Sequence, residues 1–239
     1  MRLAVLSDIH ANLEALAAVR RAGEQCGVER WVCLGDIVGY GADPQACLAQ
    51  VQEWMACCVM GNHDQAVAGL GNLGYFNAWA RQAAEWTAAQ LDPAQRRYLA
   101  GLPLSLAEGE VLYTHASPAD PGGWGYITSA REARAALRAT ASRLCFVGHS
   151  HQPLVCAAGA GLLDLDRPLA LRAGERYLVN VGSVGQPRDG NWRACFLVWD
   201  QERDTLEFVR SDYHLHRAQA KILEAGLPPF LAQRLAQGY

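Results

Sequence analysis

The chain has 239 residues, of which 51% are hydrophobic and 19% are charged, and its formal net charge at pH 7 is −3. This composition supports a large buried core, and the lack of a basic stripe disfavours duplex DNA or RNA as a partner. The N-terminal apolar run ends at a carboxylate and a histidine, unlike a secretory signal, and no apolar run approaches the ~18 residues of a membrane span. We therefore expect a soluble, cytoplasmic protein that does not bind a membrane.

The first two-thirds of the chain alternates short apolar runs with segments of helical spacing, which is typical of an α/β fold. Strands are predicted at residues 2–8, 31–36, 57–64, 110–116 and 143–149. Helices are predicted at residues 12–27, 44–54, about 75–91, from about 92, and 129–140. Start signals support three of the helices, because Asn12 is a favourable N-cap, Pro44 suits a first turn, and Ser129 opens a capping box.

The pattern changes after Pro153, where strands follow one another through short turns without a helix between them. These strands are predicted at residues 153–160, 175–183, 194–201 and 205–211. Alternation followed by an antiparallel meander predicts two stacked sheets flanked by helices. Since no linker or internal repeat interrupts the chain, we predict a single domain over residues 1–239. It would carry a helical and loop insert at about 65–105 and a helical C-terminal segment at about 215–239.

The eight cysteines form no C-x-x-C pair, which excludes the zinc-ribbon and thioredoxin types of site. Several of them lie inside apolar strand patterns. We interpret them as small buried hydrophobic residues of a protein in a reducing compartment.

Aspartate, asparagine and histidine gather where predicted strands stop. The short runs are Asp8-x-His10, Gly35-Asp36, Gly61-Asn62-His63-Asp64, Thr114-His115 and Gly148-His149-Ser150-His151. Strand ends of one sheet converge, and residues two apart on an extended segment project to the same side. A mixed set of nitrogen and oxygen donors without sulfur suits Mn, Fe, Co, Ni or Zn and suits calcium poorly. These runs therefore predict a site for two divalent metal ions.

Two such ions lie about 3.5–4 Å apart in two-metal hydrolases, where a bridging hydroxide attacks and the ions stabilise an in-line displacement at phosphorus. Asp36 is the candidate bridging carboxylate, and Asn62 and His115 are candidate oxygen and nitrogen ligands. His63 is the candidate acid for the leaving oxygen, because imidazole titrates near neutral pH. The residues thus predict hydrolysis of a phosphate ester.

Each of these residues taken alone also has an ordinary structural interpretation. Asp8 could cap a helix or a turn, and His115 could be a buried core histidine. The pair His214 and His216 has the same spacing as His149 and His151, but no other candidate ligand accompanies it. We assign this pair a structural or solvated role.

The series D-x-H, G-D, G-N-H-[DE], H and G-H-x-H resembles that of the calcineurin-like metallophosphoesterases, and residues 183–191 resemble a run of their bacterial phosphodiesterase-like branch. The resemblance implies a four-layer α/β/β/α sandwich of two mixed sheets flanked by helices. It implies that His63 is the acid or the group that orients phosphate. It implies that one metal is bound by Asp8, His10, Asp36 and His151, and the other by Asp36, Asn62, His115 and His149.

The chain also departs from relatives within that family. Ser/Thr phosphatases and dinucleoside tetraphosphatases carry G-D-x-V-D-R-G, whose arginine holds phosphate, whereas residues 35–41 here read GDIVGYG. Asp64 also replaces their glutamate, and both differences disfavour protein-phosphatase activity. Arg188 is a candidate replacement for the missing arginine and is equally typical of a surface turn. Trp124 and Tyr126 could stack on a base or aryl group or pack within their loop.

The leading expectation is a phosphodiesterase that acts on a small organic or nucleotide ester, with substrate contacts from Asn62, His63 and Arg188. A phosphomonoesterase or nucleotidase is the alternative within the same class. A non-catalytic scaffold of the same fold is the alternative from another class, and the complete set of candidate ligands argues against it. The sequence leaves the oligomeric state open, a homo-oligomer included.

Overall fold

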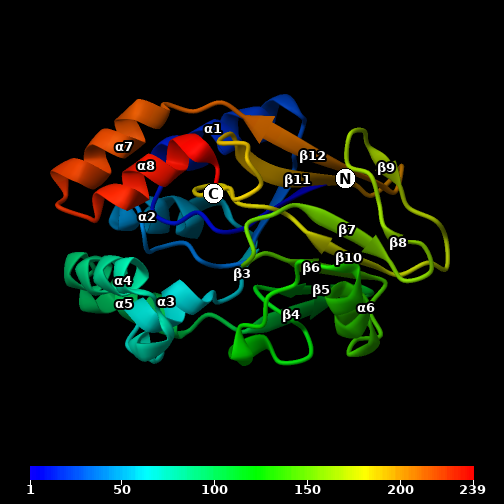
Figure 1. Ribbon diagram of the computed structural model, residues 1–239. Coiled ribbons are helices and arrows are strands. Elements are labelled where there is room, and N and C mark those ends of the chain that lie inside the picture. The colour runs from blue at the N-terminus through cyan, green and yellow to red at the C-terminus, as the bar shows by residue number, and fades with distance from the viewer.

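Two six-stranded mixed sheets stack face to face in the computed structural model, which describes residues 1–239 (Figure 1). In spatial order, the first sheet contains Cys57–Cys58 (β3), Arg30–Cys33 (β2), Arg2–Leu6 (β1), Ala194–Asp200 (β11), Thr205–Ser211 (β12) and Leu169–Ala170 (β9). The second sheet contains Ser105–Glu108 (β4), Val111–Thr114 (β5), Leu144–Val147 (β6), Tyr177–Asn180 (β10), Leu154–Ala157 (β7) and Gly161–Leu162 (β8).

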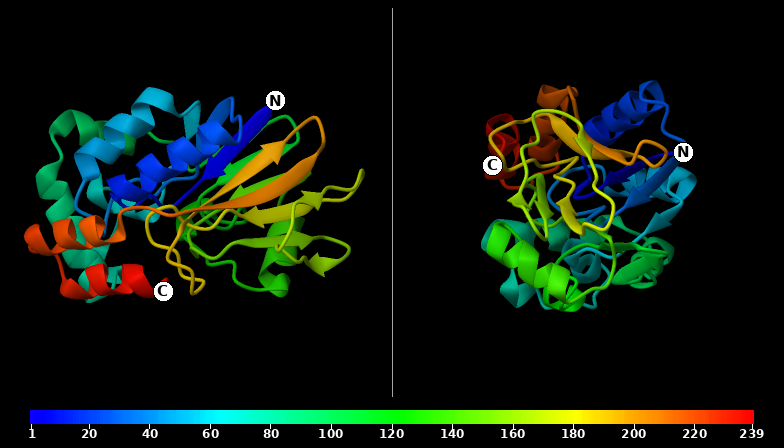
Figure 2. Two further views of the ribbon diagram at one scale, coloured as in Figure 1. Left: turned by 90° about the horizontal axis from the view of Figure 1, so that it is seen from above. Right: turned by 90° about the vertical axis from the view of Figure 1, so that its right-hand side faces the viewer.

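Helices cover the outer face of each sheet (Figure 2). The helices on the side of the first sheet are Leu13–Gln25 (α1), Pro44–Trp54 (α2), Leu215–Glu224 (α7) and Pro229–Gln237 (α8). Of these, α1 packs on β11 and β12 and is flanked by α2 and α7. The second sheet is covered by Ala130–Arg138 (α6), which packs on β7 and β10. This arrangement confirms the predicted α/β/β/α class.

The remaining helices lie at one end of the sheets and belong to two connecting segments. They are Asn62–Val67 (α3), the 3₁₀ turn Leu73–Tyr75 (η1), Ala78–Gln90 (α4), Pro93–Ala100 (α5) and the 3₁₀ turn Pro121–Gly123 (η2). The helix α3 packs on both α4 and α5. The region predicted as a helical and loop insert therefore holds η1, α4, α5 and the second half of α3.

Side chains alternate between two hydrophobic cores along the central strands. In β1, Leu3 and Val5 are buried between the two sheets, whereas Ala4 and Leu6 are buried against the helices. Successive residues of a strand point to opposite faces, so a strand covered on both sides is apolar throughout. This explains why the strands of the first two-thirds of the chain appear in the sequence as continuous apolar runs.

The third predicted strand differs most from the structure. Only Cys57–Cys58 pairs with β2, and α3 begins at Asn62, so Asn62 and His63 lie on the first turn of a helix. The backbone of Gly61 is extended and serves as the N-cap. Val59 and Met60, which precede Gly61, are buried but lie beyond the end of β3. An apolar run in the sequence predicts burial and does not show where the strand ends.

The prediction that the strands after Pro153 form one antiparallel meander is also wrong. Its strands divide between the sheets: β7, β8 and β10 join the second sheet, while β9, β11 and β12 join the first. In addition, β10 pairs in parallel with β6. Pairing partners of this kind are distant in sequence, so local periodicity does not specify them.

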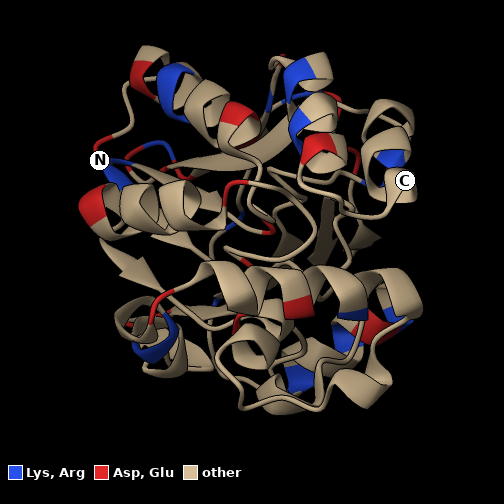
Figure 3. Cartoon of the chain, turned by 90° about the vertical axis from the view of Figure 1, so that its left-hand side faces the viewer, with Lys and Arg blue, Asp and Glu red and all other residues tan.

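None of the helices combines the length and apolar character needed to cross a lipid bilayer. On the face shown in Figure 3, Lys and Arg positions are interspersed with Asp and Glu positions along the outer helices. Basic and acidic positions are therefore mixed along those helices.

We expect Phe146→Ala to lower the free energy of unfolding by about 3–5 kcal/mol, because it opens a cavity between the sheets. Phe146 is fully buried there, with its ring 5.7 Å from Tyr113 and 6.0 Å from Trp199. Urea denaturation followed by circular dichroism would measure the loss. Leu162→Ala is the control, because Leu162 lies in the same sheet with 51% of its side chain exposed. Equal losses in the two variants would contradict the inter-sheet core.

Candidate metal centre

The predicted ligand residues lie together at one end of the stacked sheets, in loops that follow strands of both sheets. The residues from the first sheet are Asp8 and His10 after β1, Asp36 after β2 and Asn62 after β3, and those from the second are His115 after β5 and His149 and His151 after β6. All except Asn62 are buried almost completely. The ligand atoms gather in three overlapping groups, each within 4.8 Å: Asp8, His10 and His151; His10, Asp36 and His63; and Asp36, His115 and His149.

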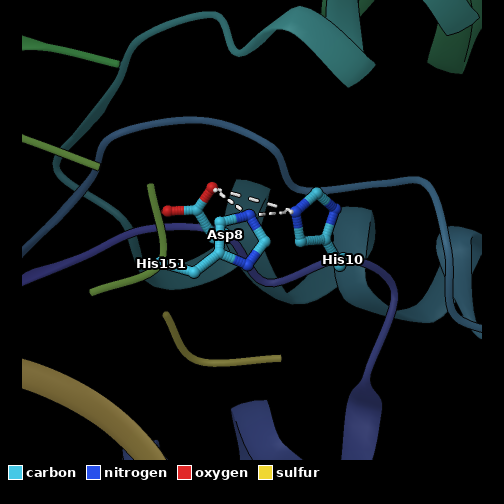
Figure 4. Close-up of side chains that lie close together, drawn as sticks. All are labelled: Asp8, His10 and His151. Carbon is cyan, nitrogen blue, oxygen red and sulfur yellow. Dashed lines mark hydrogen bonds and ion pairs between the residues drawn. The ribbon is translucent and has the colours of Figure 1, made fainter. Parts of the chain in front are cut away.

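The first group is drawn in Figure 4, where the side chains of Asp8, His10 and His151 point toward one another. His151 Nε2 lies 3.2 Å from Asp8 Oδ1, and His10 Nε2 lies 3.8 Å from the same oxygen. The two imidazole nitrogens are 3.2 Å apart. These three residues present one oxygen and two nitrogens to a common point.

Asp36 lies between this group and the side chains of His115 and His149. Its Oδ2 is 3.6 Å from His10 Nε2 and 3.4 Å from His115 Nε2. Its other oxygen accepts a hydrogen bond of 2.8 Å from the backbone N–H of His63. One carboxylate oxygen thus faces both groups, as a bridging ligand requires.

The four candidate histidine ligands share one arrangement, in which the ring nitrogen that faces away from the cluster lies against a main-chain carbonyl. The pairs are His10 Nδ1 with Val38 at 3.1 Å, His151 Nδ1 with Gln186 at 2.6 Å, His115 Nδ1 with Leu34 at 2.8 Å, and His149 Nε2 with Trp124 at 2.9 Å. A carbonyl only accepts, so the proton of each neutral imidazole is on this outer nitrogen. The inner nitrogens of His10, His149 and His151 therefore carry lone pairs, and that of His115 would do so once its proton gives way to a bound ion. Such outer hydrogen bonds are typical of metal-ligating histidines.

The inner nitrogens have the spacing of ligands that share one metal ion. His115 Nε2 and His149 Nδ1 are 3.2 Å apart, the same separation as between the inner nitrogens of His10 and His151. Two imidazole nitrogens bound to one ion at about 2.1 Å each are separated by roughly 3.0–3.4 Å. Asp8 Oδ1 and Asn62 Oδ1 are also buried without a hydrogen-bond donor. The donor set and its spacing thus fit borderline divalent ions.

Electrostatics point the same way. Burial lowers the pKa of His149 to about 3, and burial likewise lowers the pKa of His10 and His151, so these imidazoles are neutral at pH 7. His115 is buried as well, yet the carboxylate of Asp36 raises its pKa to about 10. Burial opposes the ionisation of Asp8, but His151 and His115 hold its pKa below the ordinary range. The cluster is a negative pocket that attracts positive charge.

The backbone at these residues is unusual. Nine residues other than glycine have a positive φ. Five of them, with φ between 48° and 66°, are the predicted ligands Asp8, His10, Asp36, His149 and His151. Left-handed backbone costs of order 1–3 kcal/mol at such residues and concentrates at functional sites. The loops are therefore held in conformations that bring the side chains together at the expense of local stability.

Glycines leave room for the carboxylates. A Cβ atom on Gly61 would overlap the carboxylate of Asp36, and one on Gly148 would overlap Ser7 and approach Asp8 Oδ2. The glycines that precede Asn62 and His149 in their motifs therefore allow one loop to pass directly over a carboxylate of another.

His63 differs from the other histidines of the cluster. No hydrogen bond fixes either of its ring nitrogens, and Nδ1 is buried without a partner. The ring is held instead between Tyr40 and Phe76, at centroid distances of 4.4 and 4.7 Å. Burial lowers its pKa to about 4, so a bound anion is needed to favour its protonated form.

The sequence reasoning did not assign roles to two residues that hold the loops in place. The carboxylate of Asp64 accepts backbone N–H bonds from Ile37 at 3.0 Å, Val38 at 3.3 Å and Gly61 at 3.1 Å, which joins the loops that carry Asp36 and Asn62. Ser183 Oγ donates to the carbonyl of Asp8 at 2.9 Å. Both residues lie within quoted motifs, but only the contacts reveal what they do.

The structure does not bring Arg188 into the metal cluster. Its Nη2 donates to Gln186 Oε1 at 2.8 Å, and its guanidinium carbon lies 5.9 Å from the centre of the Tyr40 ring. Its Nε is buried without a partner, so a hydrogen-bond donor remains unused beside the ring that contacts His63. His214 and His216 do not belong to any of the three ligand groups.

A cleft of about 580 Å³ opens beside the cluster. His63, Asn62 and His149 line it on one side, and α3, η1 and the loop after η2 complete it. Tyr126 lies in its wall and stacks on His149 at a centroid distance of 4.1 Å. The candidate acid and two predicted ligands are thus reachable from one open space.

Comparisons with known proteins identify the family of the chain. A model of the calcineurin-like phosphoesterase superfamily domain matches residues 1–204. The uncharacterized protein MJ0912 of Methanocaldococcus jannaschii is 38% identical over 240 residues, which cover 99% of this chain and 98% of that protein. A metallophosphoesterase from Sphaerobacter thermophilus is 38% identical, with a TM-score of 0.90 over 100% of this chain and 99% of its own. The hypothetical protein PH1004 from Pyrococcus horikoshii OT3 shares the fold, with a TM-score of 0.82 at 21% identity over 100% and 98% of the two chains. This chain therefore belongs to the calcineurin-like phosphoesterase superfamily.

Proposed function

We propose that the protein is a phosphodiesterase with two divalent metal ions, acting on a small organic or nucleotide ester. Membership of the superfamily and the clustered His and Asp side chains support the broader activity, a metal-dependent phosphoesterase. The observation that carries the proposal is the convergence of four imidazole nitrogens and two carboxylates beside the cleft. A scaffold without catalysis would have no use for this strained arrangement.

One ion would be held by Asp8, His10, Asp36 and His151, and the other by Asp36, Asn62, His115 and His149. Bound there, two divalent ions would polarise the phosphoryl oxygens and make hydroxide available at neutral pH. Their identity stays open among Mn, Fe, Zn, Ni and Co. The carbonyls behind the four histidines would keep the ligating nitrogens unprotonated and aimed at the ions.

His63 would give a proton to the leaving oxygen. The negative charge of a bound phosphate would raise the pKa of the buried imidazole and so favour the protonated form. The rings of Tyr40 and Phe76 would keep the imidazole beside the cleft without consuming its N–H groups. The nearby guanidinium of Arg188 is the candidate for contact with a phosphate oxygen.

Two features favour a diester over a monoester. No Lys or Arg side chain lines the cleft, and the phosphate-binding arginine of related phosphatases is missing from residues 35–41. A diester carries a single negative charge and two substituents, so it needs less positive charge and more space than a monoester dianion.

All eight cysteines are free, which fits the reducing cytoplasm, where we place the protein.

Metal binding should be visible without turnover. We expect Mn²⁺ at a hundredfold excess over Kd to stabilise the chelated protein by about 2.7 kcal/mol, or roughly 5–10 °C in Tm, because the ion binds only the folded state. Differential scanning fluorimetry with metal analysis would measure it. His151→Ala should reduce the shift and His214→Ala should keep it. A shift that persists unchanged in His151→Ala would place the ion elsewhere.

His63→Ala should lower kcat for diphenyl phosphate by about 10²–10⁴-fold while leaving metal content intact, because phenolate is a poor leaving group that needs the proton of His63 and no metal ligand is lost. Parallel assays with phenyl phosphate separate diesterase from monoesterase activity, and excess chelator should abolish both. His214→Ala serves as the control for loss of a histidine. Wild-type turnover in His63→Ala would refute the acid role, and a preference for the monoester would refute the diesterase.

Arg188→Ala should raise KM for the diester by roughly tenfold with a smaller effect on kcat, since it removes a charged hydrogen-bond donor to the substrate. Steady-state kinetics would distinguish the two parameters. Arg193→Ala, in the same region but paired with Asp212, is the matched control. Unchanged KM would assign Arg188 to the ordinary role of a turn arginine.

A further inference from the structure

The side of the cleft away from the cluster is uncharged and polar. Of the 17 residues that line the whole cleft, only His63 and His149 have side chains that can carry a positive charge, and none is acidic. Three of the lining residues, Gln65, Asn72 and Asn77, have carboxamide side chains away from the predicted metals. A wall of this composition does not suit a polyanion and does suit a neutral group that forms hydrogen bonds.

Local structure fixes the orientation of all three amides. Asn77 Oδ1 accepts the N–H of Ala80 at 2.9 Å as the N-cap of α4, and Asn72 Oδ1 accepts the N–H of Gly74 at 2.8 Å. Gln65 Oε1 accepts the indole N–H of Trp124 at 3.2 Å. Backbone and indole N–H groups only donate, so in each amide the oxygen is occupied and identified.

The amide NH₂ groups are consequently the free ends. None of the three donates a hydrogen bond within the protein, whereas each oxygen already has a partner. These three residues therefore offer free hydrogen-bond donors, while their acceptor oxygens are already occupied. Its complement is a group rich in acceptor atoms, such as the carbonyl oxygens and ring nitrogens of a nucleobase.

Aromatic rings supply the other half of such a site. Tyr75, Phe76, Trp124 and Tyr126 line the same cleft. The side chain of Tyr75 is 89% exposed, and Tyr126 is 56% exposed. Exposed rings offer flat apolar surfaces on which a planar heterocycle can stack.

From these features we propose that the cleft binds the nucleoside part of a phosphodiester and recognises acceptor atoms of its base through the amide NH₂ groups of Gln65, Asn72 and Asn77. This inference rests on the proposed diesterase function and adds the substrate class. It selects against polyanionic substrates such as nucleoside polyphosphates, since the wall offers no cation to a second phosphate. Thymine, with two carbonyl acceptors and no amino group, is a suitable probe.

The test compares two monoanionic esters with the same leaving group, the p-nitrophenyl ester of thymidine 5′-phosphate and p-nitrophenyl phenylphosphonate. The wild-type enzyme should have the lower KM for the thymidine ester. Asn72→Asp, Asn77→Asp and Gln65→Glu each keep the occupied oxygen and remove the free NH₂ group. Each should raise the ratio of the thymidine KM to the phenylphosphonate KM by roughly three- to tenfold. The ratio cancels the added charge, because both esters carry one negative charge.

Asn191→Asp is the matched control, because Asn191 also accepts a backbone N–H, from Arg193 at 3.1 Å, but does not line the cleft. It should leave the ratio unchanged. Cleavage of both esters with equal KM, or a ratio that none of the three variants moves, would overturn the nucleoside site and leave the diesterase intact. Cleavage of neither ester by the metal-loaded enzyme would overturn the diesterase itself.

Discussion

Two carboxylates and four imidazole nitrogens face one another in a space from which water is largely excluded. Asp8 and Asp36 are buried, and each of the four rings directs its outer N–H to a carbonyl. The charge of protonated His115 offsets only part of the negative charge, and the lone pairs of the other three rings meet the carboxylates at about van der Waals distance, which is unfavourable in a medium of low polarity. The loop conformations and the close glycine contacts are those that maintain this arrangement.

Both sheets contribute to the cluster, so its geometry depends on how they stack. The loops after β1 and β2 come from one sheet, and those after β5 and β6 come from the other. Between them lies a core that includes Leu3, Val32 and Phe146. Packing at this core sets the distance between the two halves of the ligand set. The core between the sheets thus supports the His and Asp cluster, because its rigid packing keeps the two groups of loops from moving away from each other.

The sequence indicated which loops bring His and Asp side chains together, because short motifs with fixed spacing lie after strongly apolar runs. It also predicted the layered fold, since alternation of strand and helix restricts the choice of architecture. It could not predict how the strands after Pro153 divide between the sheets, because their partners are distant in sequence. The left-handed backbone at Asp8 and His151 was equally hidden, as neither residue type requires it. The same holds for the three anchoring bonds of Asp64, which exist only once two loops meet.

Trp124 has two separate tasks. Its carbonyl accepts from His149, and its indole donates to Gln65 in the cleft wall. Residues that tolerate the left-handed backbone of this position, glycine and asparagine above all, can supply the carbonyl, but only the side chain affects the cleft. The position can therefore change during evolution in a way that alters which substrates fit while the predicted metal ligand stays in place. Such a division between backbone and side chain lets a lineage acquire new specificities without first losing its catalyst.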